Sequence, residues 1–224
     1  MTGSPALTDR RLQLRAVDGA ATSDALSVLT QATARTPLGA WLYPRREIRA
    51  ERLREAFGEL IHQATSIVLA NHGDTTVGAV LWRACPEGEQ THPYAALAAC
   101  GHPDNARLAT LANLAATRHP PEAHDCVLAL AVLPKNQGRL VGRTLLTARA
   151  SSAKPRHLII PGRWRGLLQL GYLPYGARID LPHGWPPLQP MRRAAPPPPA
   201  PPPPPRRRAP RADPPEQATA TAPG

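Results

Sequence analysis

The segment with the clearest chemistry joins an apolar strand to a helix through a short glycine-bearing turn. Residues 128–133 are apolar, Pro134 ends the run, and residues 137–142 read Gln-Gly-Arg-Leu-Val-Gly. A junction of this kind directs several unpaired backbone N–H groups, and the positive end of a helix dipole, toward whatever lies in front of it. The ligand that suits such a junction is a pyrophosphate.

The known phosphate-binding loops differ in their glycine spacing. A Walker loop needs two glycines that frame four residues and then lysine with serine or threonine, and the residue directly after Gly142 is arginine. A dinucleotide fingerprint needs three glycines at fixed offsets, and this turn has only Gly138 and Gly142. The turn therefore matches neither of these loops.

The segment resembles the coenzyme A loop of the GNAT N-acetyltransferase superfamily. That family has Val-x-Pro at the end of the strand, then Gln/Arg-x-x-Gly-x-Gly/Ala, then a Leu-Leu pair in the helix. The corresponding residues here are Val132–Pro134, Gln137–Gly142 and Leu145–Leu146. The resemblance implies acetyl-CoA as co-substrate, with its pantetheine arm along the strand and its diphosphate on the turn. The cofactor-binding residues that it implies are Ala131, Val132, Leu133, Gln137, Gly138, Arg139, Leu140, Val141, Gly142, Arg143 and Thr144.

Two positions depart from the family pattern. Leu140 stands where the family has glycine, so a side chain would crowd the phosphates or the backbone would need an angle that leucine tolerates poorly. Leu167 occupies the position where many members carry a catalytic tyrosine. The remaining candidates for the acid or base are His124, Asp125 and Tyr172, and the first two are equally explained as a polar start to the strand.

Residues 119–126 read His-Pro-Pro-Glu-Ala-His-Asp-Cys and have a superficial likeness to a metal site. The two prolines exclude a helical histidine pair, and no second Cys/His cluster has ligand spacing, so no metal is expected. Cys85, Cys100 and Cys126 are far apart and odd in number. They suit reduced thiols in the cytosol better than a disulfide framework.

The elements that must position the loop follow from hydrophobic periodicity. Apolar patterns and caps predict the following strands and helices in order: strand 12–17, helices 22–33 and 45–63, a hairpin of 66–70 and 76–82, a helix from Asp104 to Thr117, the strand before the loop, helix 141–153, strand 156–160, helix 164–170 and an antiparallel pair of 175–181 and 188–192. This is the element order of the GNAT acyl-CoA N-acyltransferase fold. The fold class expected is α/β (α+β), with a central mixed, largely antiparallel sheet flanked by helices.

Further likenesses extend the resemblance over residues 12–193. Gly171-Tyr172 resembles the family's Gly-Phe/Tyr after the last helix, and the segment from Leu181 to Arg193 resembles the ending of many bacterial members. Trp41-Leu-Tyr43 is expected in the region that shapes acceptor specificity in the family, although core packing explains it equally well.

The chain is expected to divide into a flexible N-terminus (1–11), the N-acetyltransferase domain (12–193) and a disordered Pro/Arg-rich tail (194–224). Many of the 29 prolines crowd into this tail, which favours polyproline II and cannot bury a core. A Pro-x-x-Pro stretch with flanking arginines could dock in an SH3-like groove, and a solvated low-complexity extension is the alternative.

Charge and hydropathy limit the partners. The net charge of +11 comes almost entirely from arginine, which often reflects a GC-rich genome, and part of it lies in the tail, so a nucleic-acid partner is not expected. No apolar run approaches membrane-spanning length and the N-terminus has no signal-like apolar region, so a cytoplasmic protein without membrane contact is expected.

The function that the resemblance implies is transfer of an acetyl group from acetyl-CoA to an amine of a small molecule or peptide. Because of Leu140 and Leu167, a second possible function is a catalytically weak or inactive module that binds CoA. Because of the Pro/Arg-rich tail, a third is an interaction protein that acts through this tail.

Overall fold

A seven-stranded sheet organises the described part of the chain. The computed structural model describes residues 12–17, 22–89, 91–98, 102–148, 153–162, 165–182, 185 and 187–196. The strand order is β1-β2-β3-β4-β5-β7-β6, and every neighbouring pair is antiparallel except β4 and β5. This confirms the mixed, largely antiparallel sheet. The strands are β1 (Leu12–Val17), β2 (Ser66–His72), β3 (Thr75–Cys85), β4 (His124–Val132), β5 (Arg156–Pro161), β6 (Leu173–Pro174) and β7 (Leu188–Arg193).

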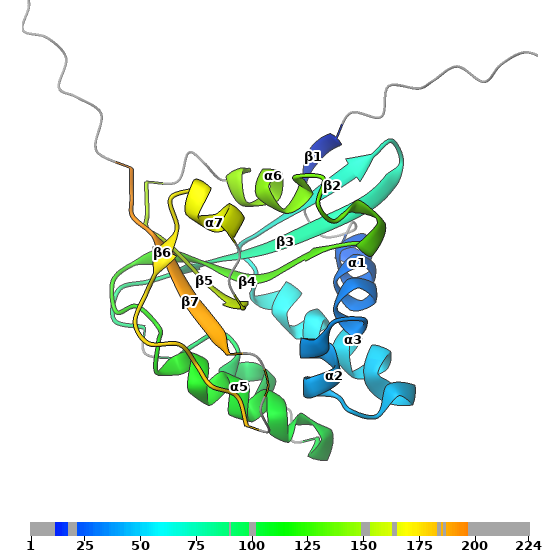
Figure 1. Cartoon of the computed structure of the whole chain (residues 1–224), viewed down its shortest axis with the longest axis horizontal. Helices are drawn as coiled ribbons and strands as arrows, with labels where there is room; N and C mark the ends of the chain where they lie inside the picture. Colours follow the sequence, from blue (N-terminus) through cyan, green and yellow to red (C-terminus); the bar gives the residue numbers. More distant parts are fainter. Residues whose placement is uncertain are drawn as a thin grey trace, which may run out of the picture.

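Helices cover both faces of the sheet, and each face has its own hydrophobic core (Figure 1). Successive strand residues point to opposite faces. Ile67 and Leu69 of β2 therefore pack in one core, while Val68 and Ala70 pack in the other. The first core contains residues of α1 (Thr22–Ala34), α2 (Pro37–Leu42), α3 (Arg46–Gln63), α4 (Ala95–Ala98) and α5 (Ala106–Ala116), and the second those of α6 (Val141–Thr147) and α7 (Arg165–Gln169).

Helix α6 packs unusually close to β3, at Gly78. A Cβ atom at this glycine would lie 2.9 Å from Leu145 Cδ1 and 3.0 Å from Val141 Cγ1. The absence of a side chain at Gly78 thus lets α6 sit against the sheet. The position of α6 fixes the glycine-bearing turn that precedes it.

Strands β4 and β5 separate soon after they meet. Their parallel pairing joins only Asp125 to Arg156 and Cys126 to His157. Beyond Cys126, β4 continues to pair with β3, while β5 continues to pair with β7. A register shift between β3 and β4 leaves Leu128 as an extra residue, because Trp82 pairs with Val127 and Leu81 pairs with Ala129. Such a bulge bends a strand and increases its twist, which fits the divergence of β4 from β5.

Several boundaries differ from the sequence-based expectation. Asp104 does not cap α5; it lies inside a 3-10 turn, where its N–H donates to His102 Nδ1. The expected strand 175–181 contributes only a single bridge, Ile179 to Leu188, and β7 pairs instead with the short β6. Helices α2 and α4 were not expected.

The segment 141–153 is described as helix only to Thr147, and residues 149–152 lie outside the described residues. Residues 1–11 and 197–224 lie outside them as well, so the flexible N-terminus and the docking role of the tail stay predictions. None of the helices in the described ranges combines the length and apolar character that crossing a membrane requires.

Candidate active site

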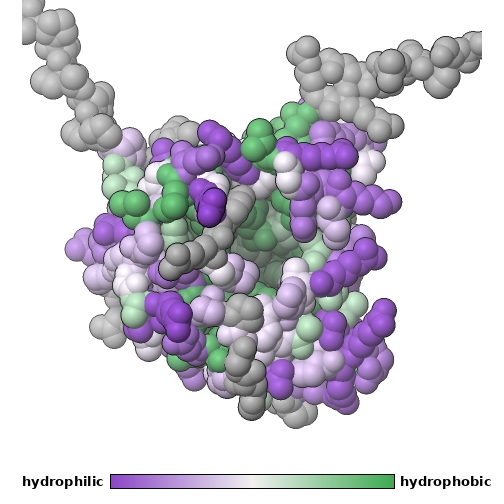
Figure 2. All heavy atoms as spheres, in the orientation of Figure 1, coloured by the Kyte–Doolittle hydropathy of each residue, from purple (hydrophilic) through white to green (hydrophobic). Residues whose placement is uncertain are grey.

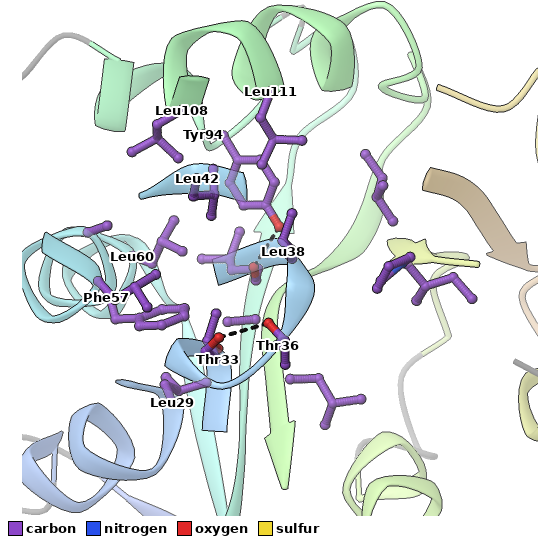
Figure 3. A pocket seen from close by; sticks show the side chains of 18 of the residues that line it. Leu29, Thr33, Thr36, Leu38, Leu42, Phe57, Leu60, Tyr94, Leu108 and Leu111 are labelled. Carbon is purple, nitrogen blue, oxygen red and sulfur yellow. Dashed lines mark hydrogen bonds between the residues drawn. The ribbon is translucent and has the colours of Figure 1, made fainter. Parts of the chain in front are cut away.

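The gap between β4 and β5 opens into an apolar cavity of about 500 Å³. Figure 2 shows it as a green hollow in the middle of the face in view. Its walls come from the divergent strands, with Val127–Leu130 on one side and Leu158–Pro161 on the other, and from helices α1 to α5. The labelled side chains in Figure 3 are mostly leucines that point inward from these helices: Leu29, Leu38, Leu42, Leu60, Leu108 and Leu111, with Phe57 beside them.

Few polar groups line this cavity. Tyr94 Oη donates to the carbonyl oxygen of Leu128 at 2.8 Å, and Tyr43 Oη donates to Asn105 Oδ1 at 3.1 Å. Thr36 Oγ1 donates to the carbonyl oxygen of Thr33 at 2.8 Å. Among the described residues, no charged side chain lines the cavity. Burial raises the pKa of the Tyr94 phenol, so this hydroxyl stays protonated at physiological pH.

A second cavity, of about 470 Å³, lies over the glycine-bearing turn. Leu130 lines both cavities, so they adjoin at this residue of β4. Arg143 lines the second cavity, and its Nη1 donates to Gln169 Oε1 at 3.5 Å. The structure brings together most of the residues predicted for the cofactor: Ala131, Val132, Gln137, Gly138, Leu140, Val141, Gly142 and Arg143 line this cavity, whereas Leu133, Arg139 and Thr144 do not.

The backbone of the turn adopts left-handed conformations at two residues. Gly138 has φ 76°, which glycine adopts freely, and Leu140 has φ 62°. Among the described residues, Leu140 is the only non-glycine residue with positive φ, and its side chain is 66% exposed. The sequence-based concern that leucine here needs an unfavourable backbone angle is confirmed. Such a conformation costs about 1–2 kcal/mol in a residue with a β-carbon.

The start of α6 suits an anionic group. Leu140 is its N-cap, and no side chain caps the helix there. The first N–H groups of a helix have no acceptor within it, and here they belong to Val141, Gly142 and Arg143, all of which line the second cavity. Arg139 is exposed on the same turn. Amides, a helix dipole and two guanidinium groups together fit the diphosphate of coenzyme A.

The residues whose backbone groups face the open edge of β4 are not all those expected to contact pantetheine. The N–H of Leu133 donates to Val77 on β3, and Ala131 pairs with Ala79 on the same strand. Because alternate residues direct their backbone groups to opposite edges, Leu130 and Val132 face the gap. The carbonyl of Val132 already accepts from Gln137 Nε2 at 3.0 Å. The backbone groups of Ala131 and Leu133 thus face β3, whereas those of Leu130 face the gap.

The catalytic candidates from the sequence lie away from both cavities. His124, Asp125 and Tyr172 are almost completely buried, and none of them lines either cavity. Burial raises the pKa of Tyr172, which packs in the second core together with Leu167. Sequence reasoning missed Tyr94, because it lies in a turn-rich segment without periodicity. Of the aromatic pair proposed for the acceptor region, Tyr43 lines the cavity, whereas buried Trp41 donates through Nε1 to the carbonyl of Pro182.

The fold of the described residues is that of the GNAT acetyltransferases. No protein-family model matches the sequence, and no curated protein matches it. Solved structures do. A histone acetyltransferase HPA2 and related acetyltransferase from Corynebacterium glutamicum has 21% identity and a TM-score of 0.60, over 82% of this chain and 96% of that chain.

Two eukaryotic enzymes have similar structures. The polyamine N-acetyltransferase of Drosophila melanogaster has 18% identity and a TM-score of 0.59, over 81% of this chain and 99% of that one. A mosquito arylalkylamine N-acetyltransferase like 5b has 13% identity and a TM-score of 0.57, over 82% and 99%. At these identities the likeness shows a shared fold.

Proposed function

We propose that this chain is an acetyl-CoA-dependent N-acetyltransferase whose acceptor carries its amine on an apolar body. The observation that carries this proposal is the meeting of two cavities at Leu130. One cavity is lined by helix N-terminal amides and Arg143, and the other by apolar side chains. A ligand with an anionic end and a ligand with an apolar body would thus meet at one point on β4.

The residues of the turn would hold the diphosphate, and acetyl-CoA would supply an activated acetyl group as a thioester. Gly138 to Arg143 supply the backbone of the cradle, and Arg143 and Arg139 supply positive charge. The exposed edge at Leu130 offers backbone groups to an amide-bearing arm in the manner of an added strand. The apolar walls exclude water and so strengthen the polar interactions inside.

Proton transfer needs one donor and one acceptor. The amine must lose a proton, and the leaving sulfur must gain one. Tyr94 Oη is a protonated hydroxyl at the cavity wall, beside the bulge of β4, and it can serve as the donor. Since no described side chain that lines the cavity is a carboxylate or imidazole, the amine loses its proton to bulk solvent before it enters and arrives uncharged.

The lining also discriminates among amines. A polycationic acceptor needs carboxylates to hold its remote charges, and the described lining has none. An arylalkylamine places its apolar part among leucines and exposes a single nitrogen. A panel of arylalkylamines and linear polyamines, assayed by release of CoA thiol, tests the proposal. We expect turnover with the arylalkylamines, and turnover confined to polyamines would contradict it.

A second candidate function is a CoA-binding module without turnover. The left-handed Leu140 and the lack of a described base in the cavity favour it. It predicts cofactor binding with no thiol release by any amine in the panel. The same assay, run beside a direct binding measurement, separates the two functions.

A further inference from the structure

A cluster of histidines and cysteines lies where β3, β4 and β5 meet, apart from both cavities. The ligand atoms of Cys85, His119 and His124 all lie within 4.8 Å of one another. The same holds for His124, Cys126 and His157. His124 belongs to both groups and links them into one cluster of five side chains.

The sheet itself assembles this cluster from distant parts of the chain. Cys85 ends β3 and pairs in register with His124 at the start of β4. Cys126 pairs with His157 of β5, at the last point where these two strands are joined. His119 comes from the segment after α5 and lies with its ring centroid 4.8 Å from that of His124.

The imidazoles of the cluster are buried without the partners that buried nitrogens normally have. Within the described residues, neither ring nitrogen of His119 or of His157 has a hydrogen-bond partner, and His124 Nε2 has none. His157 and His124 are at most 1% exposed. Buried polar atoms without partners are rare in native proteins, because each one loses its hydration without replacement. An ion within the cluster would satisfy His124 Nε2 and one ring nitrogen of a second histidine.

One hydrogen bond determines which nitrogen of His124 is free to bind a metal. His124 Nδ1 lies 2.8 Å from the carbonyl oxygen of Glu122, which can only accept, so Nδ1 carries the hydrogen. The lone pair is then on Nε2. This arrangement is common for metal-binding histidines, where a backbone carbonyl fixes the tautomer.

We propose that this cluster binds one Zn²⁺ ion, held by the Cys85 and Cys126 thiolates and by His124, with His119 or His157 as the fourth ligand. Two sulfurs and two nitrogens form a common tetrahedral zinc site. The sequence-based expectation of no metal relied on ligand spacing within residues 119–126. In the structure, Cys85 from β3 lies with His119 and His124, and His157 from β5 lies with His124 and Cys126, so residues outside 119–126 add to the donor set.

The proposed ion would crosslink the sheet at the point where the gap between β4 and β5 begins. Cys126 and His157 form the last β4–β5 pair before the strands part. With His157 as the fourth ligand, the metal would join β3, β4 and β5; with His119, it would join β3 and β4 to the segment after α5. We therefore assign it a structural role, separate from acetyl transfer.

The test begins with the full chain after removal of metal by a chelator under reducing conditions. Titration with Zn²⁺ is expected to give one ion per chain by elemental analysis, with an increase in Tm. Co²⁺ in place of Zn²⁺ is expected to give the visible bands of a tetrahedral ion and a thiolate-to-metal charge-transfer band. Failure to bind zinc in stoichiometric amount, or a cobalt spectrum without the thiolate band, would overturn the proposal.

Variants identify the ligands. Cys126→Ser and His124→Gln are expected to weaken zinc binding by roughly 100-fold or more, since loss of a supporting outer partner alone costs 10–100-fold. His119→Asn and His157→Asn show which histidine is the fourth ligand, because only one of them should have this effect. His92→Asn is the matched control: His92 is buried with its ring 5.4 Å from that of His119, and its Nδ1 already accepts from the N–H of Tyr94.

Circular dichroism of each metal-free variant separates loss of a ligand from loss of the fold. The titration of the unaltered chain does not depend on any variant folding. Cys85 and Cys126 lie on adjacent strands, offset by two residues in register, so mass analysis after alkylation also reports whether they form a disulfide. A Cys85–Cys126 disulfide that persists in reducing buffer and blocks zinc binding would contradict the proposal.

Discussion

The phenol of Tyr94 donates its hydrogen bond to the carbonyl oxygen of Leu128, at 2.8 Å. Leu128 is the extra residue of the β4 bulge, so β3 leaves its backbone unpaired. The irregularity that bends β4 away from β5 thus also supplies the acceptor that holds Tyr94 at the cavity wall. The β4 bulge thus accounts both for the opening of the cleft and for the position of Tyr94.

Replacing Tyr94 with phenylalanine is expected to lower kcat by roughly 100-fold, at the lower end of what a positioned general acid contributes. Acetyl-CoA binding should be unchanged, because Tyr94 does not line the cavity over the turn. Steady-state kinetics with the best amine of the panel, together with calorimetry, measures both effects.

Tyr43→Phe is the matched control for that variant. Tyr43 lines the same cavity, but its hydroxyl is directed to Asn105. Its replacement should leave kcat close to that of the unaltered chain. Equal losses in the two variants would indicate a packing effect and would remove Tyr94 from the role of acid.

The dependence of activity on pH follows from the protonation of the same side chain. The pKa of Tyr94 is raised by burial, so the acid keeps its proton well into the alkaline range. Activity should therefore rise with pH as the acceptor amine loses its proton, without an alkaline decline near the ordinary tyrosine pKa of about 10. The pH profiles of kcat/KM for two amines should be displaced from each other along the pH axis by the difference between the pKa values of the amines. A rise in activity at the same pH for both amines would instead indicate that a base on the protein titrates.

Leu140→Gly tests the strain in the turn. Glycine adopts φ 62° without the penalty of a β-carbon, so the free energy of unfolding should increase by about 1 kcal/mol. Acetyl-CoA should also bind more tightly, because a side chain that lines the cavity is removed. Urea denaturation and calorimetry measure the two changes.

Gly138→Ala should change the free energy of unfolding in the opposite direction, at a neighbouring position of the turn. Its φ of 76° is unfavourable for alanine, although nothing lies within 4 Å of the added Cβ. This variant should be destabilised by about 1 kcal/mol. If both variants changed stability in the same direction, backbone conformation would not be the property that limits the turn.

Gly78→Val tests the placing of α6. The added side chain would collide with Leu145 and Val141, so α6 must move, at a cost of about 1–3 kcal/mol. Cofactor affinity should fall as well, because α6 carries the N–H groups that face the second cavity. Gly58→Ala is the control: it lies in α3 with nothing within 4 Å, and better helix propensity should stabilise it slightly.

Local patterns predicted the sheet and the turn well. Strand 12–17 and the helix 22–33 follow from alternation and capping, and the structure has them as β1 and α1. The turn was identifiable because Gln137, Gly138 and Gly142 have fixed spacing. These signals lie within short stretches of chain, where backbone preference and hydrophobic period determine the structure.

The features that were missed depend on contacts between distant segments. Tyr94 becomes part of the site only through the carbonyl of Leu128, 34 residues away. Cys85 and His157 join His124 only through the register of three strands. Neither relationship leaves a periodic trace in the sequence, so neither could be read from spacing.

Binding of acetyl-CoA, followed by calorimetry, tests the central claim most directly. The unaltered chain should bind one acetyl-CoA with a dissociation constant of about 1–100 µM, within the usual range for enzyme substrates. Arg143→Ala should weaken binding roughly tenfold by removing one charge-assisted contact, while Arg178→Ala, which is exposed and paired with Asp180, should have no effect. Absence of binding at millimolar acetyl-CoA, or equal affinity in both variants, would contradict the assignment of the turn as a coenzyme A site.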